Sequence, residues 1–200
     1  MKEILAFLRD LEQNNNREWF HADIAQLTLR DCTYRIYRDT RFSQDKSPYK
    51  THFGAFLAKG GKKSMHAGYY FHVGTGTADG YPQAHMLAAG NYCYESAVVK
   101  ILREDISYGW REFSEEILAR IPSDFRVDME GALKRVPRDY PADAPYADWM
   151  RLKSYCLLAD ADDDFILQPH LAQRVAERFR STKPFLDYIN RAVDYVREEQ

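Results

Sequence analysis

The spacing of apolar residues changes from helical to strand-like and back along the chain, and this order limits the possible folds more than any other feature. Residues 2–13 have the spacing of an amphipathic helix, and a short second helix is expected near Arg17. From Asp31 to about Phe42, apolar and polar residues alternate, which predicts a strand. Because strand patterns gather in the middle and helical patterns at both ends, we expect an α+β domain rather than alternating βαβ units.

The later elements extend this pattern of central strands and outer helices. Further strands are expected at Thr51–Leu57, His66–Val73 and Met86–Tyr94, with short ones at Phe125–Met129 and Ser154–Ala159. Helical spacing predicts elements at Ser96–Ile106, Trp110–Ile121, Tyr146–Leu152, Pro169–Arg180 and Lys183–Glu198. The predicted fold is therefore a central, mainly antiparallel sheet with helices from both termini packed on it.

The length of the chain favours one domain. A chain of 200 residues can bury roughly 70% of its unfolded surface around a single core. It has no internal repeat and no linker long enough to divide it, so we expect a single domain over residues 1–200. With 45% apolar and 14% aromatic residues, it can offset the entropy of ordering by apolar burial, which excludes a disordered chain.

Charged residues and cysteines indicate the compartment. No uncharged run reaches the ~20 residues that span a bilayer, and charges interrupt the N-terminal segment that would be apolar in a signal peptide. Cys32, Cys93 and Cys156 are far apart and odd in number, which fits neither a disulfide framework nor a zinc site. We expect buried thiols in a cytoplasmic protein that has no membrane partner.

The formal net charge of −2 hides an uneven distribution of charge. Between Asp31 and His66 there are eight Lys and Arg residues and three Asp residues, a local charge of +5. The rest of the chain therefore carries −7, which argues against nucleic acid as the partner. The basic segment is the place to look for a smaller anion.

Arginines on the expected strand supply the candidate anion site. In a strand, Arg35 and Arg41 fall on one face and Arg38 on the other. Two arginines on one face can grip a carboxylate or a phosphate through paired hydrogen bonds. With the loop that follows, the candidate ligand-binding residues are Arg35, Arg38, Arg41, Ser43, Lys46, Tyr49 and Lys50. The alternative is that Arg35 pairs with Asp39 or with a distant carboxylate, and that the loop is only polar.

Two clusters of metal-ligating residue types fall short of a metal site. His52, His66 and His72 could converge on a metal ion, but their spacing is not that of a helical His pair. The acidic run Asp160–Asp164 lacks the glycine and the final glutamate of a calcium loop, so a solvated loop is expected there. The glycine-rich stretches also lack the spacing of phosphate-binding loops. We expect no metal and no cofactor.

Several of these segments resemble a known family. The segments Asn15–Phe20, Arg35–Ser43, Asp45–Thr51 and Gly68–His72 are similar to a family of uncharacterised bacterial and fungal proteins, domain of unknown function 2461. Downstream, the similar stretches are Leu133–Pro137, Leu152–Tyr155 and Phe179–Ala192. The resemblance implies an α+β fold and no reaction, so it transfers no catalytic residue. It adds Lys153, which lies in one of the similar stretches, to the candidate ligand-binding residues.

The chain departs from the family pattern in two places. Residues 21–30 replace a much longer, largely helical stretch, and residues 77–91 fit the pattern poorly. Either these are deletions, or the sequence joins residues across missing segments.

The leading functional hypothesis is binding of a small anionic ligand, bearing a phosphate or a carboxylate, in a basic cleft. The protein could be an enzyme acting on such a metabolite, and the change Arg41→Ala should then abolish binding. The alternative is a non-catalytic module for protein–protein interaction or scaffolding, because eight of the fourteen tyrosines lie between Tyr34 and Tyr94.

Overall fold

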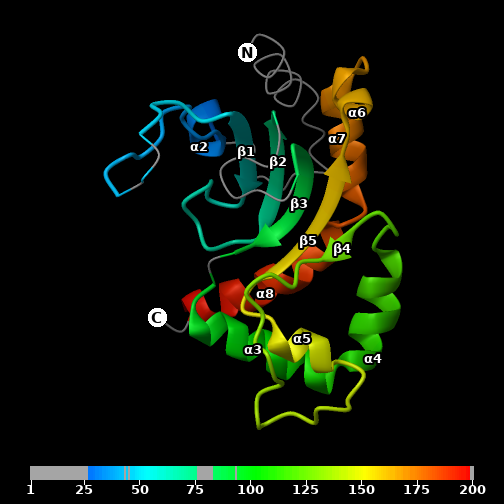
Figure 1. Cartoon of the computed structure of the whole chain (residues 1–200). Coiled ribbons are helices and arrows are strands. Elements are labelled where there is room, and N and C mark those ends of the chain that lie inside the picture. The colour runs from blue at the N-terminus through cyan, green and yellow to red at the C-terminus, as the bar shows by residue number, and fades with distance from the viewer. Residues whose placement is uncertain (1–26, 43, 45, 76–82, 93, 199–200) are drawn as a thin grey trace. The chain divides into compact units, whose positions relative to one another are not determined.

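The computed structural model describes residues 27–42, 44, 46–75, 83–92 and 94–198 (Figure 1). Within these residues the chain forms an open, antiparallel sheet of five strands in the order β1-β2-β3-β5-β4, together with seven helices. The strands are β1 (His52–Ala58), β2 (Gly68–Gly74), β3 (His85–Asn91), β4 (Arg126–Val127) and β5 (Tyr155–Ala161). This confirms the predicted α+β fold class.

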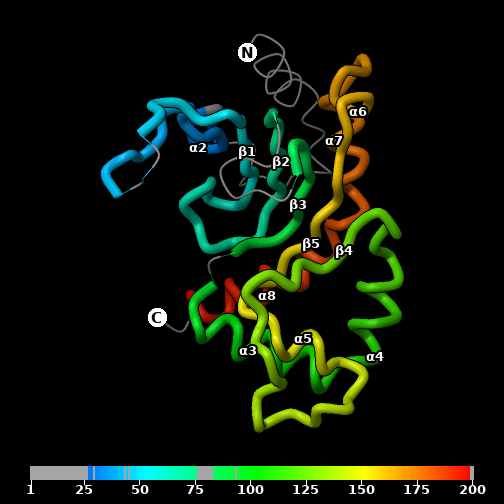
Figure 2. Tube along the Cα trace, viewed as in Figure 1, coloured from blue at the N-terminus to red at the C-terminus, as the bar shows by residue number. Residues whose placement is uncertain are grey.

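Of the helices in the described residues, one short helix precedes β1, and the others lie after β3, where β4 and β5 are placed among them along the chain (Figure 2). They are α2 (Leu29–Cys32), α3 (Ser96–Tyr108), α4 (Trp110–Glu112), α5 (Ala147–Arg151), α6 (Asp163–Leu167), α7 (Leu171–Arg180) and α8 (Lys183–Glu198). A π-helical turn, Phe113–Ile117, and a 3-10 turn, Leu118–Arg120, continue α4. The helices expected over 2–13 and near Arg17 lie outside the described residues.

The chain divides into two compact units. The described residues of Met1–Ser64, Tyr69–Ala88 and Ala159–Arg180 form the first unit. Those of Met65–Gly68, Ala89–Leu158 and Ser181–Gln200 form the second unit. The expectation of a single domain stays a prediction.

The core of the first unit is built from small and aromatic side chains. Ala55 and Ala58 of β1 and Phe71 of β2 are buried. Tyr69 of β2 packs on Phe179 of α7, with ring centroids 4.9 Å apart. The amphipathic pattern of α7 therefore buries its apolar stripe, as helical spacing predicted.

The core of the second unit is an aromatic cluster between helices and β5. Phe113 is fully buried and contacts Trp149 and Tyr188, at ring-centroid distances of 4.9 and 4.8 Å. Most of β5, including Tyr155, is buried. Helix α8 also contributes apolar residues at helical spacing: Phe185, Leu186, Ile189, Ala192, Val193 and Val196.

The strand expected over Asp31–Phe42 was wrong. Its start belongs to α2, and the rest makes only isolated bridges, from Thr33 to Ala55 and from Tyr37 to Tyr49. The alternation does not mark a buried sheet face, because Tyr34 and Tyr37 are both exposed.

The acidic run was also misjudged, because it is not a solvated loop throughout. The Asp162 side chain accepts a hydrogen bond of 2.7 Å from the backbone N–H of Phe165 and caps α6.

The thiols of Cys32 and Cys156 are buried, as expected, and Cys93 lies outside the described residues.

Candidate functional site

The predicted anion site of the first unit lies on a loop that folds back on itself. The backbone N–H of Arg38 donates to Pro48, and that of Lys50 donates to Ile36, at 3.0 and 2.8 Å. The N–H of Tyr34 donates to the carbonyl of Gly54 in β1, at 3.2 Å. We call the described part of residues 33–50 the basic–aromatic loop. Its two arms are therefore tied to each other and to the sheet.

Large rings are exposed along the basic–aromatic loop. Tyr34, Tyr37 and Tyr49 are 42%, 58% and 53% exposed, and Phe42 is 95% exposed. Tyr37 and Tyr49 contact each other across the two arms, with centroids 5.4 Å apart. These rings offer flat faces to a ligand or to another protein.

Two lysine ammonium groups lie beside one of these rings. The Nζ atoms of Lys50 and Lys62 are 5.9 and 5.8 Å from the ring centroid of Tyr34. Lys62 is held in place because its Nζ donates to the carbonyl of Thr33 at 2.5 Å and also to that of Arg30. Lys50 of the loop and Lys62, which follows β1, thus place positive charge next to an exposed aromatic side chain.

Arg41 already forms an ion pair with an acidic residue of the loop. The Nε and Nη2 atoms of Arg41 donate to the two carboxylate oxygens of Asp39, at 2.9 and 2.6 Å. These side-chain hydrogen bonds, with one from the backbone N–H of Arg41, lower the pKa of Asp39 to about 2. Arg35 is exposed and acts on Asp39 through its charge. Arg41, and not Arg35, therefore forms the ion pair with Asp39.

The Asp39–Arg41 pair leads to a pH prediction. Since the pKa of Asp39 is lower in the folded state, its stabilising contribution is present above the ordinary carboxyl pKa of about 4 and is lost as the pH falls through about 2. The change Arg41→Ala should move this titration up towards 4. Carboxyl carbon shifts in an NMR titration measure it, and Arg111→Ala, which removes an exposed arginine paired with Glu115, is the control.

The structure brings together only part of the predicted set. Lys46 Nζ donates to the carbonyl of Thr40 at 2.8 Å, within the basic–aromatic loop. Without a continuous strand, Arg35 and Arg41 do not share a strand face. Ser43 lies outside the described residues, and Lys153 is an exposed residue of the second unit.

The first unit also contains a row of buried histidines that sequence reasoning only partly found. His52 stacks on His72 at 4.7 Å, and the hydroxyl of Tyr70 lies 3.0 Å from His72 Nδ1. His85 accepts from the Gly74 N–H at 3.3 Å, and its Nε2 lies 2.7 Å from Asp163. In the described part of the chain, no group of three or more His, Cys, Asp or Glu residues is arranged to hold a metal ion.

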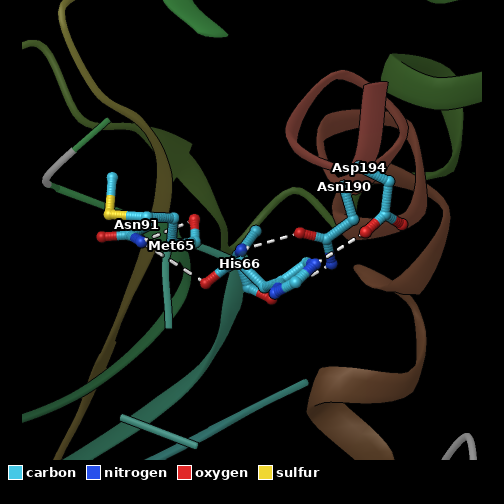
Figure 3. Close-up of polar contacts among 6 residues, drawn as sticks. Met65, His66, Asn91, Asn190 and Asp194 are labelled. Carbon is cyan, nitrogen blue, oxygen red and sulfur yellow. Dashed lines mark hydrogen bonds and ion pairs between the residues drawn. The ribbon is translucent and has the colours of Figure 1, made fainter. Parts of the chain in front are cut away.

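His66 belongs to a separate network in the second unit (Figure 3). Its Nε2 lies 2.8 Å from Asp194 of α8, while the side chain of Asn190 pairs with the N–H and C=O of Ala67 at 2.7 and 3.2 Å. From β3, Asn91 donates to the carbonyls of Met65 and His66. This network fixes the segment Met65–Gly68 to α8. The other two histidines considered as metal ligands, His52 and His72, belong to the first unit.

The family model for the conserved hypothetical protein family DUF2461 matches residues 21–188. The chain belongs to the DUF2461 family. No curated protein and no solved structure matches it.

The DUF2461 match covers the basic–aromatic loop and Lys153, so all candidate residues from the sequence fall in the family region. It ends at residue 188, before Asn190 and Asp194 of α8. Among the described residues of this DUF2461 member, no helix is both long enough and apolar enough to cross a bilayer.

Proposed function

We propose that this member of the DUF2461 family binds a small anion, bearing a phosphate or a carboxylate, on the basic–aromatic loop. The observation that carries the proposal is the position of the Lys50 and Lys62 ammonium groups beside the ring of Tyr34. An anion at this ring would be attracted by both lysines, and Tyr34 would contact an attached apolar group. The proposal is one of binding and assigns no residue to a chemical step.

The Asp39 carboxylate allows a variant that is expected to strengthen anion binding, beside one that is expected to weaken it. It accepts the two hydrogen bonds from Nε and Nη2 of Arg41 that an anion would otherwise accept. A ligand must therefore compete with Asp39 for Arg41, or must rely on Lys50 and Lys62. Removing the Asp39 charge should favour binding, and removing Lys50 should weaken it.

Phenyl phosphate and inorganic phosphate, titrated into the full chain at constant ionic strength, test this. Lys50→Ala should weaken phenyl phosphate binding by about two- to fivefold, the size of one exposed charge contact, and Asp39→Asn should strengthen it by a similar factor. Calorimetry and amide shifts of Tyr34 and Lys50 measure both. Lys100→Ala, which removes an exposed lysine of α3, is the matched control.

Three outcomes would contradict anion binding on this loop. They are no saturable shift with either phosphate, an equal loss in the Lys100→Ala control, and weaker binding in Asp39→Asn.

The second candidate function, interaction with another protein, is favoured by the side chain of Phe42, which is 95% exposed. If the protein binds another protein through Phe42 and binds no anion, neither phosphate should give a saturable shift.

A further inference from the structure

The second unit contains a pocket of about 550 Å³ that the proposed function does not use. It lies between α3, α4 and α8, and its size is that of a small-molecule site. The side chains of its lining that can carry charge or offer an aromatic face are Asp105, Tyr108, Glu112, Tyr188, Arg191 and Tyr195.

One side of α8 and the glycine between α3 and α4 line this pocket. Tyr188, Arg191 and Tyr195 lie at i, i+3 and i+7 of α8, so they share one side of that helix. Gly109 separates α3 from α4 and donates its N–H to the carbonyl of Asp105 at 2.8 Å. A Cβ at Gly109 would lie 3.0 Å from that same carbonyl oxygen, so the position stays without a side chain.

The pocket has more acidic than basic groups. Its lining has two carboxylates, those of Asp105 and Glu112, and one guanidinium, that of Arg191. Burial raises the pKa of Asp105, while the charge of Arg191 lowers it. Burial also raises the pKa of Tyr188, and the charges of Asp105 and Glu112 add to this effect, while Arg191 opposes it. With two carboxylates and one guanidinium, the lining has more acidic than basic groups, which favours a cation over an anion.

The aromatic side chains of the pocket suit a positive ligand. The guanidinium of Arg191 lies 4.9 Å from the ring centroid of Tyr188, so one ring already holds a cation. Tyr108 and Tyr195 are 91% and 50% exposed. The exposed ring of Tyr108 can contact a second cation.

We propose that this pocket binds a small organic cation, an amine whose ammonium group is attracted by Asp105 and Glu112 and whose apolar part contacts the tyrosines. The ligand chemistry is opposite in charge to that proposed for the basic–aromatic loop. The two sites therefore fail or hold independently of each other.

Benzylammonium chloride is the probe, titrated into the full chain and followed by amide and tyrosine ring shifts in NMR spectra. Benzyl alcohol and benzoate are the neutral and anionic comparisons of the same shape. Benzylammonium should bind with saturation at the residues of the pocket, about tenfold more tightly than benzyl alcohol, because only the cation is attracted by two carboxylates.

Variants of the pocket residues give the second arm of the experiment. Asp105→Asn and Glu112→Gln should each weaken benzylammonium binding by about two- to fivefold, and Arg191→Ala should strengthen it by removing the competing internal cation. Glu115→Gln is the matched control, since Glu115 is an exposed carboxylate of the adjoining π-helical turn and pairs with Arg111.

Three results would overturn the proposal. The first is the absence of a saturable shift with benzylammonium, and the second is an equal loss of affinity in the Glu115→Gln control. The third is saturable binding of benzoate that Arg191→Ala removes, because this would make the pocket an anion site. Amide spectra of each variant show whether it is folded before affinities are compared.

Discussion

Replacing Gly90 with alanine should prevent the second unit from folding. Gly90 lies in β3 with a φ of +147°, a conformation that side-chain-bearing residues rarely adopt. A Cβ at this position would lie 2.2 Å from the carbonyl oxygen of Tyr155 and 2.6 Å from the Cα of Cys156. Both atoms belong to the backbone of β5, so no side-chain rotation can relieve the contact.

The strain would reach the network that holds the segment Met65–Gly68. Asn91, the next residue after Gly90, donates hydrogen bonds to the carbonyls of Met65 and His66 (Figure 3). Moving β3 away from β5 would displace these contacts as well. We therefore expect a loss above about 4 kcal/mol in the free energy of unfolding, or an insoluble chain.

Gly131→Ala is the matched control for Gly90→Ala. Gly131 also has a positive φ, of +70°, but no atom lies within 4 Å of an added Cβ. It should cost only the backbone strain of about 1–2 kcal/mol. Urea unfolding followed by circular dichroism and amide spectra compares the two variants. If both lose the same small amount, close packing at Gly90 is not what fixes β3.

The sequence predicts the bounds of an element best where one face of that element is buried. The predicted bounds of α8, Lys183–Glu198, are those of the structure, because its buried residues recur at helical spacing and Pro184 suits a first turn. The spans expected for β1, β2 and β3 each overlap the observed strands. In each of them, most residues are buried, so the apolar pattern reports the fold directly.

The same patterns mislead where side chains are exposed. The alternation of apolar and polar residues from Asp31 to Phe42 predicts a strand, but the loop is held by hydrogen bonds between its arms and to β1. The pairing of Asp39 with Arg41 is local and could have been inferred from the sequence. Because the Arg41 guanidinium is already paired, the proposed anion site is a pair of lysines beside Tyr34 rather than an arginine pair.

Contacts between distant residues could not be inferred from local patterns. His66 and Asp194 are 128 positions apart, and no periodicity connects them. The pocket likewise depends on α3 packing against α8, which brings Asp105 and Arg191 to one cavity. Neither residue lies in the basic segment between Asp31 and His66, so the charge distribution along the sequence does not indicate this pocket.

Replacing Phe113 with alanine should remove much of the stability of the second unit. Phe113 is 0% exposed and begins the π-helical turn that follows α4. Its ring contacts Trp149 edge-on and Tyr188 at a tilt, while Trp110 lies 6.2 Å away. Truncating such a side chain leaves a cavity between helices, and the expected loss is about 3–5 kcal/mol.

Urea unfolding, followed by tryptophan fluorescence, measures this loss, since Trp110 and Trp149 border the cavity. Phe113→Leu should lose less, because leucine fills part of the same space. Phe165→Ala is the comparison at a half-buried ring of the first unit, and it should cost clearly less than Phe113→Ala. Because Phe113 supports Tyr188, Phe113→Leu should also weaken benzylammonium binding. Equal losses for Phe113→Ala and Phe165→Ala would show that Phe113 does not anchor the core beneath the pocket.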